Sequence, residues 1–555
     1  MNSPLNDKKR WEQIRTEDRY LPLRDILSEK YEQLKETDLP VFTFSLFING
    51  IKTGDRHEYE AVYRKRREFL TVYTLISLIY PDEPIYLSKL EDIICSILEE
   101  YTWCLPAHLP ADRLNSPCHI DLFAAETGLY VTEIKHLLYD RLSPVVVERI
   151  TQEVDRRIIQ SFRNNHYIFE DYKSNWASVC GGSVGAVLLY ENLDVYMEVK
   201  PRIEKCMSNY LESIDEEGVS SEGSAYLQYG LTFYLIYNDL LKLETLNRID
   251  NVNIEKIRKV ARFIDGINLS RDIVFPYADG GGKQSMDVWM VNYLRNNVSS
   301  DMPAFYGTNI FSKRLSSTIR NYYMYEPITD GSSENKTIYF ENFGALVSRK
   351  DIYAIGIKAG HNGEEHNHND VGSFSLVADN KQLLCDLGAP LYTIHGFKAE
   401  NYDKVIQRSS FGHNVPIING KPQHYGKQFF GTIKVDGNEV VIDFQNAYDI
   451  KINKLTRTFS LGENEILLKD EFDENAVWTD RFVSLIEPVI SEGLVKIDCL
   501  NIIFDNSLLS VDFKKVVEKN HSNIDTSIYL IDFETKKNES KAEYRFTFDE
   551  GTKRG

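Results

Sequence analysis

The sequence lacks several features that would assign it at once to a large class of proteins. Its seven cysteines are scattered through 555 residues and form no CxxC pair, which argues against both a disulfide framework and a cysteine zinc site. No stretch approaches the roughly 20 consecutive apolar residues that a membrane helix needs. The N-terminal residues show no apolar leader. From the sequence as given we therefore expect a cytoplasmic protein, or a periplasmic or secreted one if a signal peptide has been removed.

The chain also lacks an excess of positive charge. Lys and Arg total 64 against 83 Asp and Glu, for a formal net charge of -19. Nucleic acids and anionic membranes are bound through a basic face, so neither is expected as a partner. An acidic polysaccharide remains compatible with this charge, but only through a local basic or hydrogen-bonding cleft. The oligomeric state is left open.

The two parts of the chain differ in their hydrophobic periodicity. Residues 1–325 contain successive apolar i, i+3, i+4 patterns, for example over 58–80 and 222–244, which predict helix after helix in a bundle, solenoid or toroid. Residues 326–555 alternate in short β-branched or aromatic runs separated by Asn-Gly, Asp-Gly and Gly-Glu turns. These runs predict an antiparallel β-sandwich. The predicted fold is therefore a helical domain over 1–325 followed by a β-sandwich domain over 326–555.

The densest chemistry lies between Gly360 and Pro390, in the stretch GHNGEEHNHNDVGSFSLVADNKQLLCDLGAP. In an extended strand, His366, His368 and Asp370 would leave the same face, because strand side chains alternate with a period of two. Imidazole and carboxylate are ligands that zinc prefers, and imidazole also transfers protons near neutral pH. This stretch therefore predicts a face that holds a metal, moves a proton, or does both.

Several motifs, taken together and in order, resemble those of the heparinase II/III-like polysaccharide lyases. They are EEYTWCLPAH, HIDLFAAETG, KSNWASVCGGSVGAVLL and SSEGSAYLQYG, followed by HNHNDVGSF, LLCDLGAPLY and QRSSFGHNVPIING. The resemblance implies an (α/α) toroid packed against a β-sandwich, with the active cleft between them. It also implies cleavage of a uronic-acid glycan by β-elimination, which leaves an unsaturated uronate. Glycosaminoglycans such as heparan sulfate, hyaluronan or chondroitin are the first candidates, and alginate, oligoalginate or a bacterial exopolysaccharide is the alternative.

The resemblance implies catalytic roles for three residues. Asn175 matches the asparagine that hydrogen-bonds the uronate carboxylate, and neutralising that group makes the proton on carbon 5 more acidic. Tyr226 matches the tyrosine that acts as acid, and in some members also as base. His366 matches the catalytic histidine, a base or a charge-stabilising partner.

The resemblance also implies a Zn²⁺ ion that is chiefly structural. His368, Asp386 and His413 match its three protein ligands, and three such ligands plus water are acceptable zinc coordination. A misplaced ligand would also misplace His366, two residues from His368. The metal would therefore affect the rate without touching the substrate.

The chain departs from some relatives directly after the catalytic asparagine. Those relatives carry histidine there, whereas this chain has Trp176, which we take as a substrate-binding candidate. His108 or His119 could supply the second imidazole instead.

Four further residues are candidates for contact with substrate. Tyr229 lies three residues after Tyr226 on the same helix face and is a rival for the acid role. Tyr402 lies where some relatives place an additional catalytic or subsite tyrosine. His361 and Arg408 complete the set, and Arg408 is a candidate for carboxylate or sulfate contact.

Two other classes of function compete with a lyase. A non-catalytic protein that binds acidic glycans would use the metal only for stability. A glycoside hydrolase would need two carboxylic acids facing each other across the scissile bond. Carboxylates are available at Glu126, Asp215, Glu222 and Asp279, but no paired pattern is recognisable among them.

Overall fold

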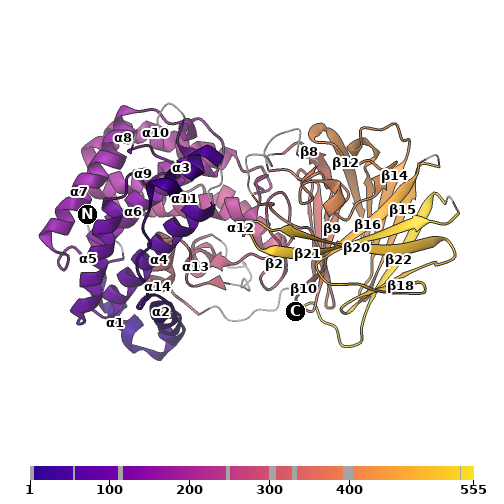
Figure 1. Cartoon of the computed structure of the whole chain (residues 1–555), viewed down its shortest axis with the longest axis horizontal. Coiled ribbons are helices and arrows are strands. Elements are labelled where there is room, and N and C mark those ends of the chain that lie inside the picture. Colours follow the sequence, from indigo (N-terminus) through magenta and orange to yellow (C-terminus); the bar gives the residue numbers. More distant parts are fainter. Residues whose placement is uncertain are drawn as a thin grey trace.

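The computed structural model describes residues 5–53, 57–110, 117–245, 251–298, 308–327, 334–364, 366–391, 404–474, 476–537 and 539–555. Helices fill the first part of the chain and strands the second, and the two parts lie side by side (Figure 1). We call them the helical half and the sandwich half. This arrangement confirms the predicted helical toroid followed by an antiparallel β-sandwich.

The helices of the helical half follow one another along the chain. They are α1 (Lys8–Thr16), α2 (Leu21–Leu34), α3 (Phe44–Thr53), α4 (His57–Ile79), α5 (Pro84–Leu98), α6 (Leu122–Leu137), α7 (Pro144–Val154), α8 (Gln160–Asn164), α9 (Asn175–Glu191), α10 (Leu193–Glu212), α11 (Ser224–Glu244), α12 (Ile254–Gly266), α13 (Val288–Asn297) and α14 (Leu315–Tyr323). Two short strand pairs interrupt the later helices, β1 (Asn268–Ser270) with β2 (Ile273–Val274) and β3 (Met286–Asp287) with β4 (Thr308–Asn309).

Glycines in α9 allow it to pack closely against its neighbours. A Cβ atom on Gly182 would lie 2.8 Å from the carbonyl oxygen of Phe233 in α11. In the same pair of helices, Ser178 Oγ donates to the carbonyl oxygen of Gly230 over 2.7 Å. The contacts advance in the same direction along both helices, so α9 and α11 run parallel. Their N-terminal ends therefore lie at the same end of the toroid.

Within the described residues, the strands of the sandwich half form three antiparallel sheets. Its strands are β5 (Lys336–Phe340), β6 (Ala345–Arg349), β7 (Ala354–Lys358), β8 (Gly360–Asn362), β9 (Phe374–Ala378), β10 (Lys381–Leu384), β11 (Ile417–Ile418), β12 (Gly426–Asp436), β13 (Glu439–Asp443), β14 (Leu455–Leu461), β15 (Glu465–Phe472), β16 (Trp478–Ser484), β17 (Val489–Ser491), β18 (Leu494–Ile497), β19 (Leu500–Phe504), β20 (Leu509–Lys519), β21 (Asp525–Thr535) and β22 (Lys541–Phe548). The strand orders are β10-β9-β7-β6-β5, β11-β16-β21-β20 and β17-β18-β19-β22-β15-β14-β13-β12-β8.

The sheet that contains β5 to β7 forms the layer between the two halves. Side chains alternate along its strands, so Val347 joins the hydrophobic core of the helical half while Leu346 joins the core of the sandwich. Burial on both faces explains why β6, β7 and β9 are apolar at nearly every position. Gly356 of β7 has no side chain because Phe275 of the helical half occupies that space.

Among the described residues, no helix combines the length and apolar character needed to cross a membrane.

Candidate active site and metal centre

The histidine-rich stretch is a loop. β8 ends at Asn362 and β9 begins at Phe374, and His366 has a left-handed backbone with φ of 54°. The prediction of an extended strand with His366, His368 and Asp370 on one face is therefore wrong. The loop sends the three side chains to different partners, and Asp370 pairs with Lys358 of β7.

His366 meets the helical half through two contacts. Its Nδ1 lies 2.7 Å from Oδ2 of Asp279, and its ring stacks on that of Tyr226 with centroids 5.0 Å apart and an angle of 21° between planes. Because Nδ1 donates to the carboxylate, Nε2 is the nitrogen left for other partners. Burial lowers the pKa of His366, but the hydrogen bond and charge of Asp279 outweigh it, and the pKa is raised above its ordinary value. Two predicted catalytic residues from separate halves thus lie face to face.

The three predicted zinc ligands meet in the interior of the sandwich half. His368, Asp386 and His413 are buried, and one ligand atom from each lies within 4.8 Å of the others. The Nδ1 atoms of His368 and His413 lie 3.6 and 3.0 Å from the Asp386 carboxylate, yet neither makes a hydrogen bond. Burial opposes ionisation of Asp386, but the two imidazoles hold its pKa well below the usual range.

The outer nitrogens of both histidines are held in the way that metal ligands usually are. His413 donates from Nε2 to the carbonyl oxygen of Gln407 over 3.0 Å, and His368 Nε2 lies 3.2 Å from Oδ1 of Asp279. In its neutral form, each ring carries its proton on Nε2 and turns an unprotonated Nδ1 toward Asp386, as expected of a metal ligand whose other nitrogen is held by the protein. Two imidazole nitrogens and a carboxylate fit Zn²⁺.

Asn414 ties the segments that carry two of these ligands together. Its amide donates to the carbonyl oxygens of Phe374 and Cys385 over 2.6 and 3.1 Å, and its Oδ1 accepts from the Val483 amide over 2.7 Å. Asn414 follows His413 and holds the residue before Asp386, so it fixes the spacing of two of the three candidate metal ligands.

Asn175 lies at the first position of α9. Ser174 is the N-cap and accepts from the Trp176 amide, so Asn175 is not the capping residue. Its side chain is buried, and no described residue makes a hydrogen bond with its Nδ2. A buried amide donor without a partner costs free energy, which points to a ligand that accepts from it. Since α9 and α11 run parallel, Asn175 and Tyr226 lie at the same end of the toroid.

Tyr229, the rival of Tyr226, has a different environment. Its hydroxyl donates to Glu126, which also accepts from Tyr130, and the guanidinium of Arg314 lies 3.6 Å from the ring centroid. Burial and the Glu126 charge raise the pKa of Tyr229 well above its ordinary value. The structure therefore places this phenol in a network internal to the toroid.

Trp176 lies against His108, with ring centroids 5.0 Å apart. His108 Nδ1 lies 2.8 Å from Oδ2 of Asp121, the N-cap residue of α6. The loop before α6 thus brings an imidazole to the start of α9, beside Trp176. For His119, the nearest described ring is that of Tyr167.

The remaining candidates differ in their surroundings. Arg408 is buried, and its Nη2 lies 3.8 Å from Oδ2 of Asp279. His361 Nε2 lies 2.9 Å from Oε1 of Glu364, and His361 lines a cavity of about 300 Å³ at the seam of the two halves. Tyr402 lies outside the described residues.

This seam cavity adjoins the loop that carries His366. Its walls come from both halves and include Ser221, Tyr277, Phe343 and Asn367. The cavity combines aromatic rings with polar groups, which suits a sugar ring, and its lining also includes the charged side chains of Asp215, Lys358 and Glu364.

Sequence patterns do not reveal the role of Asp279. They offer it only as a possible hydrolytic acid, in the segment ADGGGKQS, yet its two oxygens contact both His366 and His368. The sequence signal that could have indicated this contact is the run of three glycines after Asp279, a pattern that allows a loop to come close to another backbone.

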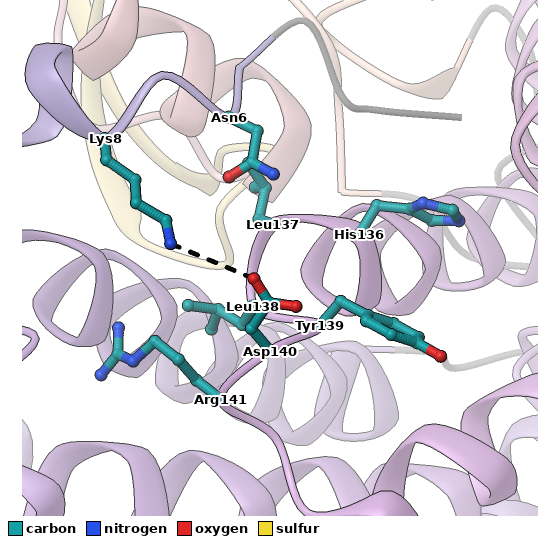
Figure 2. A pocket seen from close by; sticks show the side chains of 8 residues that line it. All are labelled: Asn6, Lys8, His136, Leu137, Leu138, Tyr139, Asp140 and Arg141. Carbon is teal, nitrogen blue, oxygen red and sulfur yellow. Dashed lines mark ion pairs between the residues drawn. The ribbon is translucent and has the colours of Figure 1, made fainter.

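A separate cavity of about 290 Å³ lies in the helical half (Figure 2). It is lined by Asn6, Lys8 and residues 136–141, and Lys8 and Asp140 form an exposed ion pair of 4.0 Å there. None of the predicted catalytic or metal-binding residues lines it.

A toroid joined to a β-sandwich, with this group of residues at the seam, defines a polysaccharide lyase fold. More particularly, residues 335–480 match the family described as heparinase II/III-like, C-terminal, and this part of the chain is such a domain. The predicted resemblance is thereby confirmed. No curated protein matches the sequence.

Solved structures of three lyases are similar to almost the whole chain. Heparinase III has 13% identity and a TM-score of 0.61, with 99% of this chain and 92% of that chain covered. A mutant of the heparan sulfate lyase HepC from Pedobacter heparinus has 12% identity and a TM-score of 0.58, with 99% and 93% covered. Chondroitin AC lyase from Streptomyces coelicolor A3, in complex with chondroitin sulphate, has 10% identity and a TM-score of 0.58, with 98% and 82% covered. At these identities the likeness establishes the fold alone.

Proposed function

We propose that this protein is a polysaccharide lyase that cleaves uronic-acid glycans by β-elimination. The single observation that carries the proposal is the contact between Tyr226 and His366, which come from separate halves and stack at the seam. Asn175 supports it, because its buried amide donor has no partner among the described residues.

The reaction assigns a task to each of these groups. The Asn175 amide donates to the uronate carboxylate and so stabilises the negative charge that develops when carbon 5 loses its proton. The bond from carbon 5 to hydrogen breaks, a double bond forms between carbons 4 and 5, and the bond from carbon 4 to the glycosidic oxygen breaks. The departing oxygen takes a proton from Tyr226. Nε2 of His366 takes the proton from carbon 5. In the alternative, ionised Tyr226 takes that proton and returns it to the departing oxygen, and His366 stabilises the charge.

Zn²⁺ bound by His368, Asp386 and His413 would hold the 366–370 loop in place. The ion would lie in the interior of the sandwich half, because all three ligands are buried. Its contribution is to the position of His366.

Glycosaminoglycans are the first substrates that we propose. The similar solved structures include enzymes named for heparin, heparan sulfate and chondroitin, and another is a xanthan lyase from Paenibacillus, so alginate and bacterial exopolysaccharides are the alternative. Two of the carboxylates that a hydrolase would need are already engaged: Asp279 with two histidines and Glu126 with two tyrosines.

The test follows the ultraviolet absorbance of the conjugated unsaturated uronate, which hydrolysis does not produce. Zinc-loaded protein is mixed with heparan sulfate, hyaluronan, chondroitin sulfates, alginate and xanthan, beside the variants Tyr226→Phe and His366→Ala. We expect absorbance to grow on one class of glycan and to be lost in both variants. A flat trace on every glycan, combined with measurable binding to one of them, would replace the lyase with a glycan-binding protein.

A further inference from the structure

Asp279 lies between the catalytic histidine and the metal-binding group. Its Oδ2 is 2.7 Å from Nδ1 of His366, and its Oδ1 is 3.2 Å from Nε2 of His368. The side chain is fully buried. One carboxylate therefore contacts two imidazoles that have different tasks.

Only an ionised carboxylate can accept from both rings at once. By accepting from Nδ1 of His366 it leaves Nε2 of that ring for the substrate, and by accepting from Nε2 of His368 it leaves Nδ1 of that ring for a metal. An asparagine at this position would have one oxygen that accepts and one nitrogen that donates, so it could satisfy one histidine but not the other.

The backbone on both sides of this contact is unusual. Ala278, directly before Asp279, has φ of 52°, and His366 has φ of 54°. Non-glycine residues in this region store strain and are held there by their surroundings. The loop after Asp279 also packs against the sandwich half, since a Cβ atom on Gly388 would lie 3.1 Å from Cα of Gly281.

Asp279 belongs to the helical half, whereas both histidines belong to the sandwich half. The contact therefore crosses the seam between the halves. It also orients both His366 and the candidate metal ligand His368. Arg408 Nη2, 3.8 Å from Oδ2 of Asp279, adds a buried cation that favours the ionised carboxylate.

We propose that Asp279 is a positioning residue that couples metal binding to the orientation of His366. The catalytic part of this inference rests on the proposed lyase function, whereas the part concerning the metal does not. Loss of the Asp279 charge would disturb both sites at once, although the residue touches neither the metal nor the substrate.

The test compares Asp279→Asn with wild type, with His366→Ala, and with the matched control Asp287→Asn. Asp287 is a partly buried aspartate of the same half, 3.4 Å from the side-chain amides of Asn309 and Asn321 and apart from both sites. Zinc affinity is measured by competition with a chromophoric chelator, and kcat and KM are measured at saturating zinc.

We expect Asp279→Asn to weaken zinc binding roughly 10–100-fold and to lower kcat by a similar factor, with little change in KM. His366→Ala should lose activity and keep the wild-type zinc affinity, and Asp287→Asn should keep both. Wild-type zinc affinity in Asp279→Asn, or a wild-type kcat at saturating zinc, would overturn the coupling.

A third readout does not need a substrate. The rate at which diethyl pyrocarbonate modifies His366 is followed by mass spectrometry of the peptide that contains it. The ring should react faster in Asp279→Asn, because Nδ1 loses its acceptor, and equal rates would overturn the inference. If wild type were inactive on every glycan while the zinc affinity and the modification rate changed as expected, the lyase would fail and the coupling would stand.

Discussion

The two sides of the candidate cleft are built differently. On the helical side, Asn175 and Tyr226 lie at the N-terminal ends of parallel helices, and the Asn175 amide has no partner in the part of the chain that the structure describes. On the sandwich side, the Nε2 atoms of His368 and His413 are held by a carboxylate and a carbonyl, while both Nδ1 atoms face Asp386 without a hydrogen bond. The helical side thus keeps an amide donor for an anionic ligand, whereas the sandwich side keeps two imidazole nitrogens for a metal.

The largest effect should come from the helical side. Tyr226→Phe removes the proton donor and should lower kcat by roughly 10²–10⁴-fold. Tyr229→Phe is the matched variant, one helical turn away, and should have a much smaller effect because its hydroxyl is bound to Glu126. Steady-state kinetics on the glycan identified by absorbance would decide between them. If Tyr229→Phe were the inactive variant, the two roles would be exchanged.

On the sandwich side, the largest expected effect of a substitution is on the free energy of unfolding. Arg457 is fully buried, pairs with Asp470 and Asp480, and donates to the carbonyl oxygens of Gly372 and Asn414. Arg457→Met leaves both carboxylates without their cation and should cost about 3–5 kcal/mol of unfolding free energy.

The matched control for this substitution is Arg545→Met, in β22. Arg545 is 56% exposed and pairs with Glu465, so its loss should cost no more than about 1 kcal/mol. Chemical denaturation of both variants measures the difference. Equal losses would mean that the buried cluster does not stabilise the sandwich half.

Asn175→Ala should separate function from stability. The loss of a hydrogen bond to a charged carboxylate, about 1.5–3 kcal/mol, corresponds to a fall of roughly 10–100-fold in kcat/KM. Stability should not fall, because the Asn175 amide has no partner to lose. Asn209→Ala is the opposite case: its buried amide donates to the carbonyl oxygen of Glu170 over 2.8 Å, so stability should fall while kcat/KM is kept. A stability loss in Asn175→Ala without a kinetic defect would make that residue structural.

The smallest expected effect concerns the support of the metal site. Asn414→Ala removes the hydrogen bonds that hold the segments carrying His413 and Asp386, and it should weaken zinc binding about tenfold. Asn501→Ala, which removes an exposed amide bound to Asp549, is the control and should bind zinc as wild type does. Unchanged affinity in Asn414→Ala would show that the ligands hold their own geometry.

Much of the fold followed from periodicity, because helical and alternating patterns report directly on which side chains are buried. The metal-binding group also followed, since two histidines and an aspartate in the order of a family motif predict a common cluster of ligands. The strand predicted for the segment around His366 is wrong, because this segment is a loop. An alternating pattern of histidine and asparagine fits a strand, but Asp279 and Lys358 draw the side chains to different sides.

The contact of Asp279 was beyond the reach of the sequence for a physical reason. It joins residues 87 positions apart in separate halves, and local patterns carry no information about which loops meet across such a seam. The capping residue of α9 was also difficult to predict from the sequence. Ser174 and Asn175 are both good capping residues, and only the structure shows that the serine caps α9 and leaves the asparagine amide unpaired.

The close approach of the glycine loop to the sandwich has a consequence for how this protein tolerates mutation. Gly388, with φ of 66°, faces Gly281 across the seam, and a Cβ atom on Gly282 would collide with the side chain of Gln382. A side chain on Gly388 would press on the backbone of Gly281 and would be strained by the positive φ, without removing a contact from the core of either half. In a library of random variants, we therefore expect substitutions of Gly388 to yield proteins that fold, retain two intact cores and nevertheless have lost their activity.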